Sequence, residues 1–299
     1  MGVDLKQAIG KICAVVVTCN RKELLGECLT ALLNQTRPLD EVIVIDNAST
    51  DGTDRCLREK FPNITHIRLP ENIGGAGGWH EGMKLAYDKG YDWIWLMDDD
   101  AMPLNDALQK LLTAMEQLPA DKIGALLSNV VWSREEVDHT ISKGNFEVDV
   151  GVFPGWLAPR KAIERVGLCR KDFFIYWEDI EYSGRLRNNG FSLYRVSSSY
   201  VIHKDWLAQP QKSINILLRR VSSPIYPNWK SYYLYRNQIL MYKSQHRNYE
   251  LLRTLLVQIP TQLVIRLLIR DTGKIKFILK ATIDGLFNRT GKRVSPAAK

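Results

Sequence analysis

Short apolar runs alternate with stretches of helical periodicity along the first hundred residues of the chain. The apolar runs are rich in β-branched residues, as buried strands are, and they cover residues 12–18, 42–46, 64–69 and 92–97. Helical spacing of apolar residues marks residues 21–35, 51–60 and 77–90, and the last of these stretches ends at Gly90, a suitable helix C-cap. This alternation predicts βαβα winding, and hence an α/β fold with a mostly parallel sheet flanked by helices.

The pattern changes after residue 103. We predict, in order, a helix over 104–118, a strand over 123–132, turns with a short helix over 150–167, a loop entering a helix over 173–190 and a strand over 191–203. From about residue 228 the pattern is helical, with many aromatic residues and few acids. The sequence therefore predicts two regions: residues 1–206 with the sheet, and residues 207–299 as a basic, mostly helical C-terminal region.

Composition narrows the class of protein. With 45% hydrophobic and 25% charged residues, the chain has the profile of a soluble globular protein rather than a disordered one. Its five cysteines include no CxxC pair, so a disulfide framework and a zinc knuckle are not indicated, and a reducing cytoplasm fits best. The N-terminal sequence lacks a secretory signal, and no run approaches the roughly 18 uninterrupted apolar residues of a membrane span. We therefore expect a chain that does not cross a membrane.

The net charge of +8 is unevenly placed. Residues 204–299 hold 18 Lys and Arg against four Asp and Glu, a balance of +14, which leaves −6 for residues 1–203. A basic region can face nucleic acid, anionic lipid or an acidic substrate, or can simply be a solvated surface. No recognised nucleic-acid-reading motif accompanies the charge, so we predict no nucleic-acid partner.

Polar residues follow each of the first four predicted strands at its carboxyl end, where open α/β sheets bind their ligands. These residues are Thr18 to Arg21, Asp46 to Ser49, Asn72 to Gly75 and Asp98 to Asp100. A single polar loop is ordinarily a solvent-facing connection. Four such loops at one edge of a sheet indicate a binding site.

Three adjacent carboxylates, Asp98, Asp99 and Asp100, repel one another unless a positive group compensates them. Mg²⁺ and Mn²⁺ prefer carboxylate oxygens, and a metal that serves a nucleotide keeps only one or two of them from the protein. Capping of a helix that begins near Pro103 would explain one aspartate but not three. The alternating spacing of an EF-hand is missing. The cluster therefore indicates a cation site.

Two further segments carry candidate chemistry. The glycines of ENIGGAGGWHEG, residues 71–82, allow backbone to approach a phosphate or sugar before a helix, although the segment is neither a P-loop nor a dinucleotide fingerprint. In WEDIEYSGR, residues 177–185, acids open a helix, and neighbouring aromatic rings can raise the pKa of a carboxyl and make it a general base. His203, at the end of the next strand, can be a metal ligand or an ordinary structural residue.

Six segments together resemble inverting family 2 glycosyltransferases of the GT-A fold. In chain order they are VVVTCNR, VIVIDNASTDGT, NIGGAGG, MDDDA, WEDIEYSGR and VIH, between residues 15 and 203. VIVIDNASTDGT followed by the acidic cluster is the specific part, and the other segments gain specificity from their order. NIGGAGGW and DDDA also resemble galactofuranosyltransferases, and rhamnosyltransferases are similar in pattern.

The resemblance implies a role for each matching residue. A nucleotide-sugar donor would be held by Thr18, Asn20, Arg21, Asp46, Asn47, Asn72, Gly74, Gly75, Asp98 and Asp99. Asp98, Asp100 and His203 would bind Mn²⁺ or Mg²⁺. Asp179 would be the catalytic base for an acceptor hydroxyl, with Trp177 and Glu178 in contact with the acceptor. Glu178 stands where many relatives have an aspartate, which leaves its share in acceptor contact open.

We expect transfer of galactofuranose from UDP-galactofuranose to a glycan or lipid-linked acceptor in cell-surface polysaccharide synthesis. A rhamnosyltransferase that uses dTDP-rhamnose is the nearest alternative. A nucleotidyltransferase also combines an α/β fold with aspartates, but its glycine-rich basic loop after the first strand is missing. A non-catalytic carbohydrate- or membrane-binding protein is the third alternative.

The basic tail allows two interpretations. Residues 251–289 mix apolar residues with Arg and Lys at helical intervals, as interfacial helices do. Such a tail can hold a cytoplasmic enzyme against the anionic inner face of the cell membrane, beside a lipid-linked acceptor. It can equally be a helical cap on the catalytic domain or the interface of a homo-oligomer.

Overall fold

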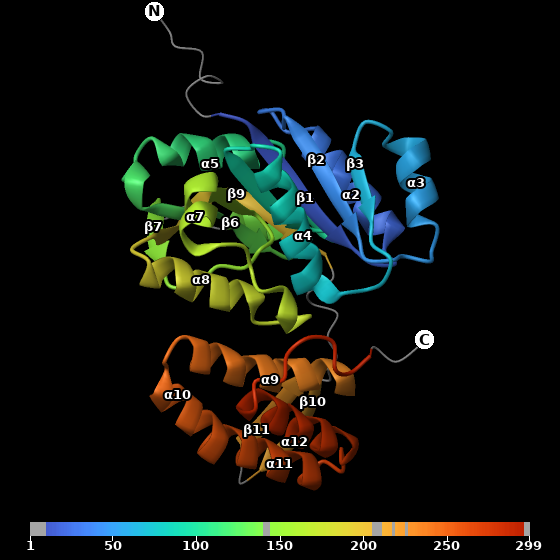
Figure 1. Ribbon diagram of the computed structural model, residues 1–299, viewed down its shortest axis with the longest axis vertical. Coiled ribbons are helices and arrows are strands. Elements are labelled where there is room, and N and C mark those ends of the chain that lie inside the picture. Colours follow the sequence, from blue (N-terminus) through green and yellow to red (C-terminus); the bar gives the residue numbers. More distant parts are fainter. Residues whose placement is uncertain (1–9, 140–143, 205–210, 217–218, 225–226, 296–299) are drawn as a thin grey trace, which may run out of the picture. The chain divides into compact units, whose positions relative to one another are not determined.

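A computed structural model describes the chain except for residues 1–9, 140–143, 205–210, 217–218, 225–226 and 296–299 (Figure 1). The chain forms two compact units. The first consists of Met1–Lys171 and Asp179–Asp205, and the second of Asp172–Glu178 and Trp206–Lys299. The seven residues from Asp172 to Glu178 thus belong to the second unit, although their neighbours on both sides belong to the first.

The first hundred residues follow the predicted βαβα winding. The elements are β1 (Ile12–Thr18), α2 (Lys22–Leu33), β2 (Glu41–Asp46), α3 (Thr53–Lys60), β3 (Thr65–Arg68), α4 (Gly74–Asp88) and β4 (Trp93–Asp98). Strand β1 pairs in parallel with both β2 and β4, and β2 pairs in parallel with β3. The prediction of an α/β fold is confirmed.

Both faces of β1 are covered, which explains why its sequence is apolar without alternation from Ile12 to Val17. Ile12, Ala14 and Val16 pack in one core with residues of α2 and of α5 (Ala107–Met115). Cys13, Val15 and Val17 pack on the other face in a second core, which includes residues of α4. Figure 1 shows these helices on the two sides of the sheet.

The rest of the first unit completes the sheet. Its remaining elements are β5 (Ala101–Pro103), η1 (Ala120–Lys122), β6 (Ile123–Val131), α6 (Arg134–His139), β7 (Asn145–Val148), β8 (Trp156–Pro159), α7 (Arg160–Val166), α8 (Glu178–Asn188) and β9 (Ser192–His203). The short helix η2 (Lys171–Phe173) leads from the first unit into the second. The strand order is β3-β2-β1-β4-β8-β6-β9-β5, and β7 pairs with β9.

The sheet is mixed. Strands β1 to β4 pair in parallel and β6 pairs in parallel with β9, so the prediction of a mostly parallel sheet holds for these six strands. Strand β8 is antiparallel to β4 and to β6, and β5 and β7 are antiparallel to β9. The four residues of β8, WLAP, lie between a glycine and a helix, and they are too short a run to stand out in the sequence. Pairing direction is a tertiary property that apolar runs do not encode.

The topology brings one set of strand ends together. Because β8 runs against both β4 and β6, those two strands point the same way, and β9 is parallel to β6. The carboxyl end of β9 therefore lies at the same edge of the sheet as the carboxyl ends of β1, β2 and β4. This edge carries His203, Thr18, Asp46 and Asp98.

Two predicted element boundaries were wrong. Helix α4 begins at Gly74 rather than near residue 77, so all five glycines of the 71–82 segment lie inside the helix. The helix predicted from residue 104 is α5, which begins at Ala107 after Asp106. Asp98 to Asp100 precede β5 and not a helix, so helix capping does not explain them.

The second unit is built mainly of helices. They are α9 (Asn228–Ser244), α10 (Asn248–Arg253), the π-helical turn η4 (Thr254–Gln258), α11 (Ile259–Leu268) and α12 (Gly273–Leu286). An antiparallel hairpin of β10 (Gln211–Ile216) and β11 (Arg219–Pro224) precedes them and was not predicted. The core of the unit is aromatic, with Phe174, Tyr232, Tyr233 and Tyr235 packed against residues of α11 and α12.

Asn248–Leu268, which comprises α10, η4 and α11, is long and apolar enough to cross a membrane by length and composition, and 17% of its most apolar window is buried. Counting uninterrupted apolar residues missed this segment because polar residues interrupt the run, namely Arg253, Thr254, Gln258, Thr261, Gln262 and Arg266. Its exposed apolar side chains include Leu252, Leu256 and Leu267.

Candidate active site

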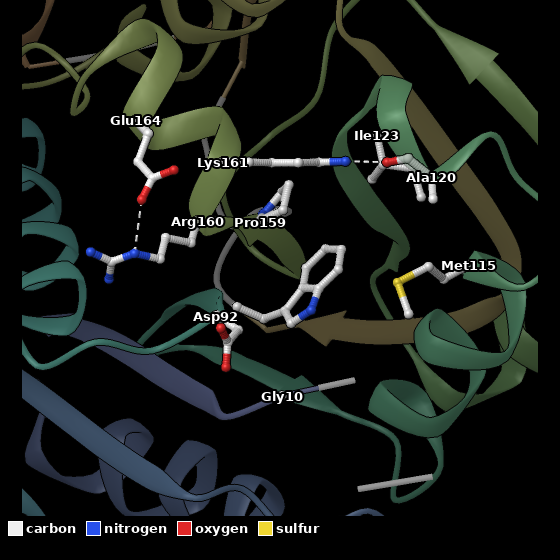
Figure 2. A pocket seen from close by; sticks show the side chains of 10 residues that line it. Gly10, Asp92, Met115, Ala120, Ile123, Pro159, Arg160, Lys161 and Glu164 are labelled. Atoms are coloured by element: carbon white, nitrogen blue, oxygen red, sulfur yellow. Dashed lines mark hydrogen bonds and ion pairs between the residues drawn. The ribbon is translucent and has the colours of Figure 1, made fainter. Parts of the chain in front are cut away.

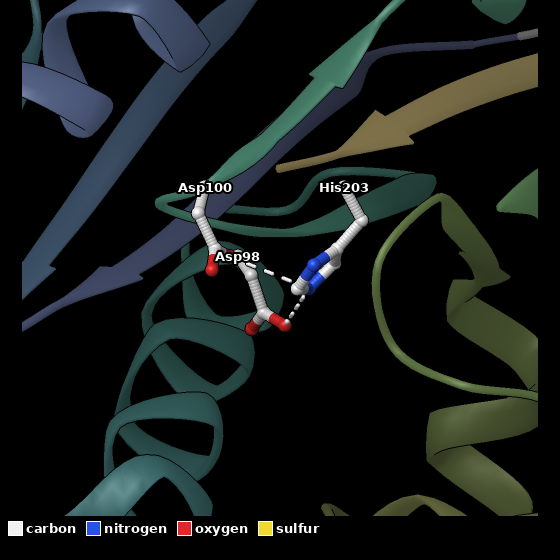
Figure 3. Close-up of side chains that lie close together, drawn as sticks. All are labelled: Asp98, Asp100 and His203. Atoms are coloured by element: carbon white, nitrogen blue, oxygen red, sulfur yellow. Dashed lines mark hydrogen bonds and ion pairs between the residues drawn. The ribbon is translucent and has the colours of Figure 1, made fainter. Parts of the chain in front are cut away.

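The carboxyl ends of β4 and β9 bring together side chains that are 105 residues apart in sequence (Figure 3). Asp99 and Asp100 fill the two positions between β4 and β5, and β5 pairs with the end of β9 so that Ala101 lies opposite His203. His203 Nε2 lies 3.3 Å from Asp98 Oδ2 and 3.4 Å from Asp100 Oδ1. The predicted metal ligands therefore form one cluster.

The geometry of this cluster fits a divalent cation. Ligand atoms of Asp98, Asp100 and His203 lie within 4.8 Å of one another. A cation bound octahedrally at about 2.1 Å has neighbouring ligand atoms about 3 Å apart, which is close to the two distances from His203 Nε2. Two carboxylate oxygens and an imidazole nitrogen are also a donor set that suits Mn²⁺ and Mg²⁺.

The acidic cluster holds more negative charge than its neighbours compensate. Burial raises the pKa of Asp99 to about 7, although Arg21 and Thr18 act to lower it. Burial and the charge of Asp98 raise the pKa of Asp100. Carboxyl groups that resist ionisation in this way are stabilised as carboxylates when a cation binds beside them.

The charges of the neighbouring aspartates also act on the pKa of His203. Burial alone would lower the pKa of the imidazole, but the hydrogen bond and charge of Asp98, together with the charge of Asp100, raise it. A protonated imidazole is therefore the competing positive charge at this position, and metal binding there would release its proton.

Thr18 and Arg21 connect the end of β1 to the acidic cluster. The Thr18 hydroxyl donates a hydrogen bond of 2.7 Å to Asp99 Oδ2. The Arg21 guanidinium lies 2.7 Å from Asp100 Oδ2 and 3.4 Å from Asp99 Oδ1, and the Arg21 side chain is 40% exposed. Arg21 thus adds a solvent-accessible positive charge at the site where a diphosphate is expected.

Asp46 and Asn47 are both buried and hold loops in place. Asp46 Oδ1 accepts a hydrogen bond of 2.8 Å from the backbone N–H of Ser49. Asn47 donates to the carbonyl of Gly74 and accepts from the N–H of Ile73, which ties the end of β2 to the start of α4. Their predicted contacts with the nucleotide remain predictions.

Asn20 lies beside this loop on the exposed side. Its φ of 57° is in the left-handed region, its backbone N–H donates to Ser49 Oγ, and its side-chain oxygen accepts from the N–H of Thr50 at 2.7 Å. The loops after β1 and β2 are therefore joined by hydrogen bonds, as a binding edge made from two loops requires. Its predicted donor contact also remains a prediction.

Asn72, Gly74 and Gly75 form the entrance to α4. Asn72 Oδ1 accepts a hydrogen bond of 2.8 Å from the N–H of Gly74, which has a φ of +82°. A Cβ on Gly75 would meet no atom within 4 Å, so the backbone there is open to a ligand. The N-terminus of a helix carries unpaired N–H groups and favours an anion.

Asp179 lies in the first turn of α8, where its carboxylate accepts from the N–H of Ile180 at 2.8 Å. Burial raises the pKa of Asp179 to about 6, and the charge of Asp98 acts in the same direction, which places the two carboxylates within electrostatic range. Asp179 is partly exposed to solvent. It can therefore accept a proton near neutral pH from a molecule that reaches it.

Trp177 and Glu178 immediately precede the proposed base but belong to the second unit. The Trp177 ring packs edge-on against Tyr242, with centroids 6.1 Å apart. Its indole N–H is buried and has no hydrogen-bond partner among the described residues. A buried indole N–H without a partner can donate a hydrogen bond to a polar group of a bound molecule.

His66 and Arg68 were not predicted, although they surround Asp46. His66 Nε2 and Arg68 Nε each lie 3.8 Å from Asp46 Oδ2. Burial would raise the pKa of Asp46, but His66 and the hydrogen bonds from Ser49 lower it, so the buried carboxylate stays ionised. The basic residues in THIR, at the end of the third apolar run, were the available signal.

A pocket of about 590 Å³ lies elsewhere on the first unit (Figure 2). It is lined by Asp92 and Trp93, at the opposite end of β4 from Asp98, and by residues of α7. Its cationic groups are already paired: Arg160 with Glu164, and Lys161 with the carbonyl of Ala120. This pocket therefore lacks the chemistry found at the carboxyl edge of the sheet.

Comparison with known proteins agrees with the site. The family model described as Glycosyl transferase family 2 matches residues 13–162. The galactofuranosyltransferase GlfT1 of Mycobacterium tuberculosis is 31% identical over 201 residues, which are 59% of this chain and 64% of that protein. The dTDP-rhamnosyl transferase RfbF of Shigella flexneri is 26% identical over 302 residues, which are 94% of this chain and 97% of that protein.

Solved structures show the same fold. A structure of GalNAc-T7 with UDP, GalNAc and Mn²⁺ superposes with a TM-score of 0.57 at 13% identity, and it covers 80% of this chain and 48% of that one. A structure of S. aureus TarS 1-349 with UDP has a TM-score of 0.51 at 19% identity, with coverage of 64% and 60%. This chain thus spans less than two thirds of both solved chains. The family match and the shared architecture lead to one conclusion: the chain belongs to glycosyl transferase family 2 and is a glycosyltransferase with a GT-A-like α/β fold.

Proposed function

We propose that the protein is a metal-dependent, inverting hexosyltransferase that uses a nucleotide-sugar donor. The observation that carries this proposal is the cluster of Asp98, Asp100 and His203, at the same edge of the sheet as the N-terminus of α4. Asp179 supplies a second carboxyl within electrostatic range, with its pKa raised to about 6. A cation that stabilises the leaving diphosphate and a separate base that deprotonates the acceptor together suit a single-displacement sugar transfer.

Each part has its own task. The residues that would hold Mn²⁺ or Mg²⁺ are Asp98, Asp100 and His203. Asp99 accepts a hydrogen bond from Thr18 and would flank the cation. The proposed nucleotide contacts are Thr18, Asn20, Arg21, Asp46 and Asn47, and those along the sugar and diphosphate are Asn72, Gly74 and Gly75.

The proposed reaction is a single displacement. Asp179 accepts the proton of an acceptor hydroxyl as its oxygen attacks the anomeric carbon, and the bond from that carbon to the nucleotide diphosphate breaks on the opposite side, so the configuration inverts. When bound, the metal neutralises negative charge that develops on the leaving diphosphate. Arg21 contributes a second positive charge there.

The proposed donor is UDP-galactofuranose, in keeping with the galactofuranosyltransferases that this chain resembles over about 60% of its length. A rhamnosyltransferase that uses dTDP-rhamnose is the second candidate, because the likeness to RfbF extends over 94% of the chain and so includes the C-terminal helices. In either case the acceptor would be a glycan or lipid-linked saccharide in cell-surface polysaccharide synthesis.

We also propose a cytoplasmic enzyme that is peripheral on the inner face of the cell membrane. Leu256, Leu267 and Leu268 are 72%, 59% and 61% exposed on the segment from α10 to α11. Arg253 and Arg270, at either side of these leucines, are also exposed. Exposed leucines flanked by cations suit an anionic bilayer surface, where a lipid-linked acceptor would be presented.

Calorimetric titration tests the proposed donor site. The titrants are UDP-galactofuranose, UDP-galactopyranose and dTDP-rhamnose, each with Mn²⁺ or with EDTA. We expect one of them to bind with Mn²⁺ and to lose at least about tenfold in affinity with EDTA, because the diphosphate is held through the metal. Asp100→Asn should cause the same loss, whereas the exposed Asp121→Asn should cause none.

Equal binding of a nucleotide sugar with Mn²⁺ and with EDTA would contradict the proposal that a metal ion holds the donor. Absence of binding by all three donors would favour the non-catalytic carbohydrate- or membrane-binding alternative.

A further inference from the structure

The segment just before the proposed base has an unusual backbone. Phe174, Tyr176 and Trp177 have φ values of 69°, 68° and 72°. Large side chains rarely adopt this left-handed region, and such backbone persists only where the surroundings hold it. Glu178 follows at once and begins α8, and Asp179 is the next residue. Residues 173–177 thus lead directly into the helix that carries Asp179.

One side chain of α9 is bonded to three successive parts of this segment. Asn237 Nδ2 lies 2.9 Å from the carbonyl oxygen of Phe173, 2.8 Å from that of Ile175 and 2.9 Å from that of Tyr176. Asn237 has no exposed surface. The amide thus satisfies carbonyls that a left-handed segment cannot satisfy with helical or sheet bonds.

The neighbouring residue orients this amide. Arg236 Nε donates to Asn237 Oδ1 at 2.8 Å, which leaves the NH₂ group facing the three carbonyls. The same guanidinium donates to the carbonyl of Phe173 at 2.8 Å and to that of Gly291 at 2.5 Å. Arg236 is fully buried, and its charge lies over the rings of Tyr232 and Tyr233. A buried charge with this many partners is rigid.

Aromatic packing holds the other side of the segment. The Phe174 ring stacks on Tyr233 with centroids 4.7 Å apart, and Trp177 packs against Tyr242. All of these partners lie on α9, so a single helix contacts the segment through both its backbone and its side chains.

We infer that Asn237, oriented by Arg236, is a positioning residue: it holds residues 173–177, the segment that leads directly into the helix carrying the base Asp179. The inference rests on the proposed function for the role of Asp179. It assigns α9 a part in catalysis without contact with the substrate, because the helix acts only through the backbone that enters α8.

Hydrogen exchange and kinetics of Asn237→Ala test this inference. We expect the amides of residues 174–178 to exchange at least about tenfold faster, because their carbonyl anchors are lost. For the nucleotide sugar identified by calorimetry, Kd should change by less than about twofold, whereas kcat should fall about 100-fold, as expected for a base displaced by about an ångström.

Ile239→Ala is the matched control. It removes a fully buried side chain from the same helix on the side that faces Gly285, so it should lower the melting temperature without changing exchange at 174–178 or kcat. Arg236→Lys is a milder second variant, which keeps the positive charge but loses the guanidinium fork, and it should change both readouts in the same direction as Asn237→Ala.

If Asn237→Ala and Ile239→Ala changed hydrogen exchange at residues 174–178 and kcat to the same extent, the inference would be overturned, because both variants would then act only through the stability of the protein. If the wild-type protein turns over none of the nucleotide sugars, the proposed function fails instead. The exchange comparison still decides in that case whether Asn237 holds the segment.

Discussion

Two carboxyl groups of the first unit, those of Asp46 and Asp179, have opposite electrostatic environments. Asp46 is fully buried, yet His66 and Ser49 lower its pKa and keep it ionised. Among the described residues, Asp179 accepts hydrogen bonds from local backbone N–H groups, and burial raises its pKa to about 6. Asp46 therefore stays a carboxylate at neutral pH, whereas Asp179 can exchange a proton there.

Replacement of the base should separate binding from turnover. We expect Asp179→Asn to lower kcat by about 10²–10⁴-fold, the usual contribution of a general base, while the Kd of the donor stays within about twofold. Wild-type kcat should fall as the pH drops below about 6, since protonation of Asp179 removes the base. Steady-state kinetics between pH 5 and 8 measure both effects.

The exposed Asp149→Asn serves as the control for this experiment and should retain the wild-type rate and pH profile. Near-normal turnover by Asp179→Asn would exclude Asp179 as the base.

At the scale of elements, helix α4 approaches β1 and β2 unusually closely. A Cβ on Gly82 would lie 2.3 Å from Val15 Cγ1 and 3.1 Å from Ile45 Cγ1, and one on Gly78 would lie 2.5 Å from Val17 Cγ1. These glycines serve helix–sheet packing, not phosphate approach. Because α4 begins at the donor edge, their close contact also sets the position of its N-terminus.

Gly82→Ala should therefore destabilise the protein. Overpacking costs about 1–3 kcal/mol, and it is only partly offset by the gain of about 1 kcal/mol from replacing a glycine inside a helix. Gly26→Ala in α2 is the matched control, since a Cβ there meets no atom within 4 Å, and it should raise the free energy of unfolding by up to about 1 kcal/mol. Urea denaturation measures both. Equal stabilisation by the two changes would contradict the packing argument.

The sequence predicted the elements better than their arrangement. The four parallel strands and the acidic cluster at their edge follow from apolar runs and from the chemistry of residues after each strand. The antiparallel insertion of β8 and the joining of His203 to Asp98 depend on contacts 105 residues apart, which local patterns do not encode. Asn237 was missed because nothing in the sequence distinguishes it from other polar residues in a helix rich in aromatic residues. Its role becomes visible only in the structure, where it contacts the carbonyls of Phe173 and Tyr176.

At the scale of the whole chain, the second unit combines a buried aromatic core with an apolar exterior. Besides the leucines from α10 to α11, helix α12 exposes Leu279, Ile283 and Leu286 at 46%, 49% and 42%. Exposed apolar residues at this density mark an interaction surface rather than ordinary solvent contact. The neighbouring cations favour an anionic bilayer over a second copy of the chain.

Vesicle sedimentation tests this surface. The protein should bind vesicles of phosphatidylglycerol and phosphatidylcholine more tightly than vesicles of phosphatidylcholine alone, and added salt should weaken binding because the lipid attraction is partly electrostatic. A Leu256→Ser, Leu267→Ser double variant should bind at least about tenfold less tightly, since each leucine contributes more than about 1 kcal/mol when fully buried.

Leu33→Ser, which replaces a leucine that is 55% exposed on the first unit, is the control and should bind as the wild type does. Unchanged vesicle binding by the double variant would show that Leu256 and Leu267 do not contact the membrane. A loss of dimers in light scattering would instead identify a homo-oligomer interface.

The chain passes from the first unit to the second at residue 172, returns at 179 and leaves again at 206. This interleaving limits how the enzyme can be recombined with its relatives. A hybrid joined at one junction near residue 206 would separate residues 172–178 from the foreign helix that has to replace α9. Laboratory chimaeras therefore have to exchange residues 172–178 and 206–299 as a pair, and gene conversion in nature meets the same constraint.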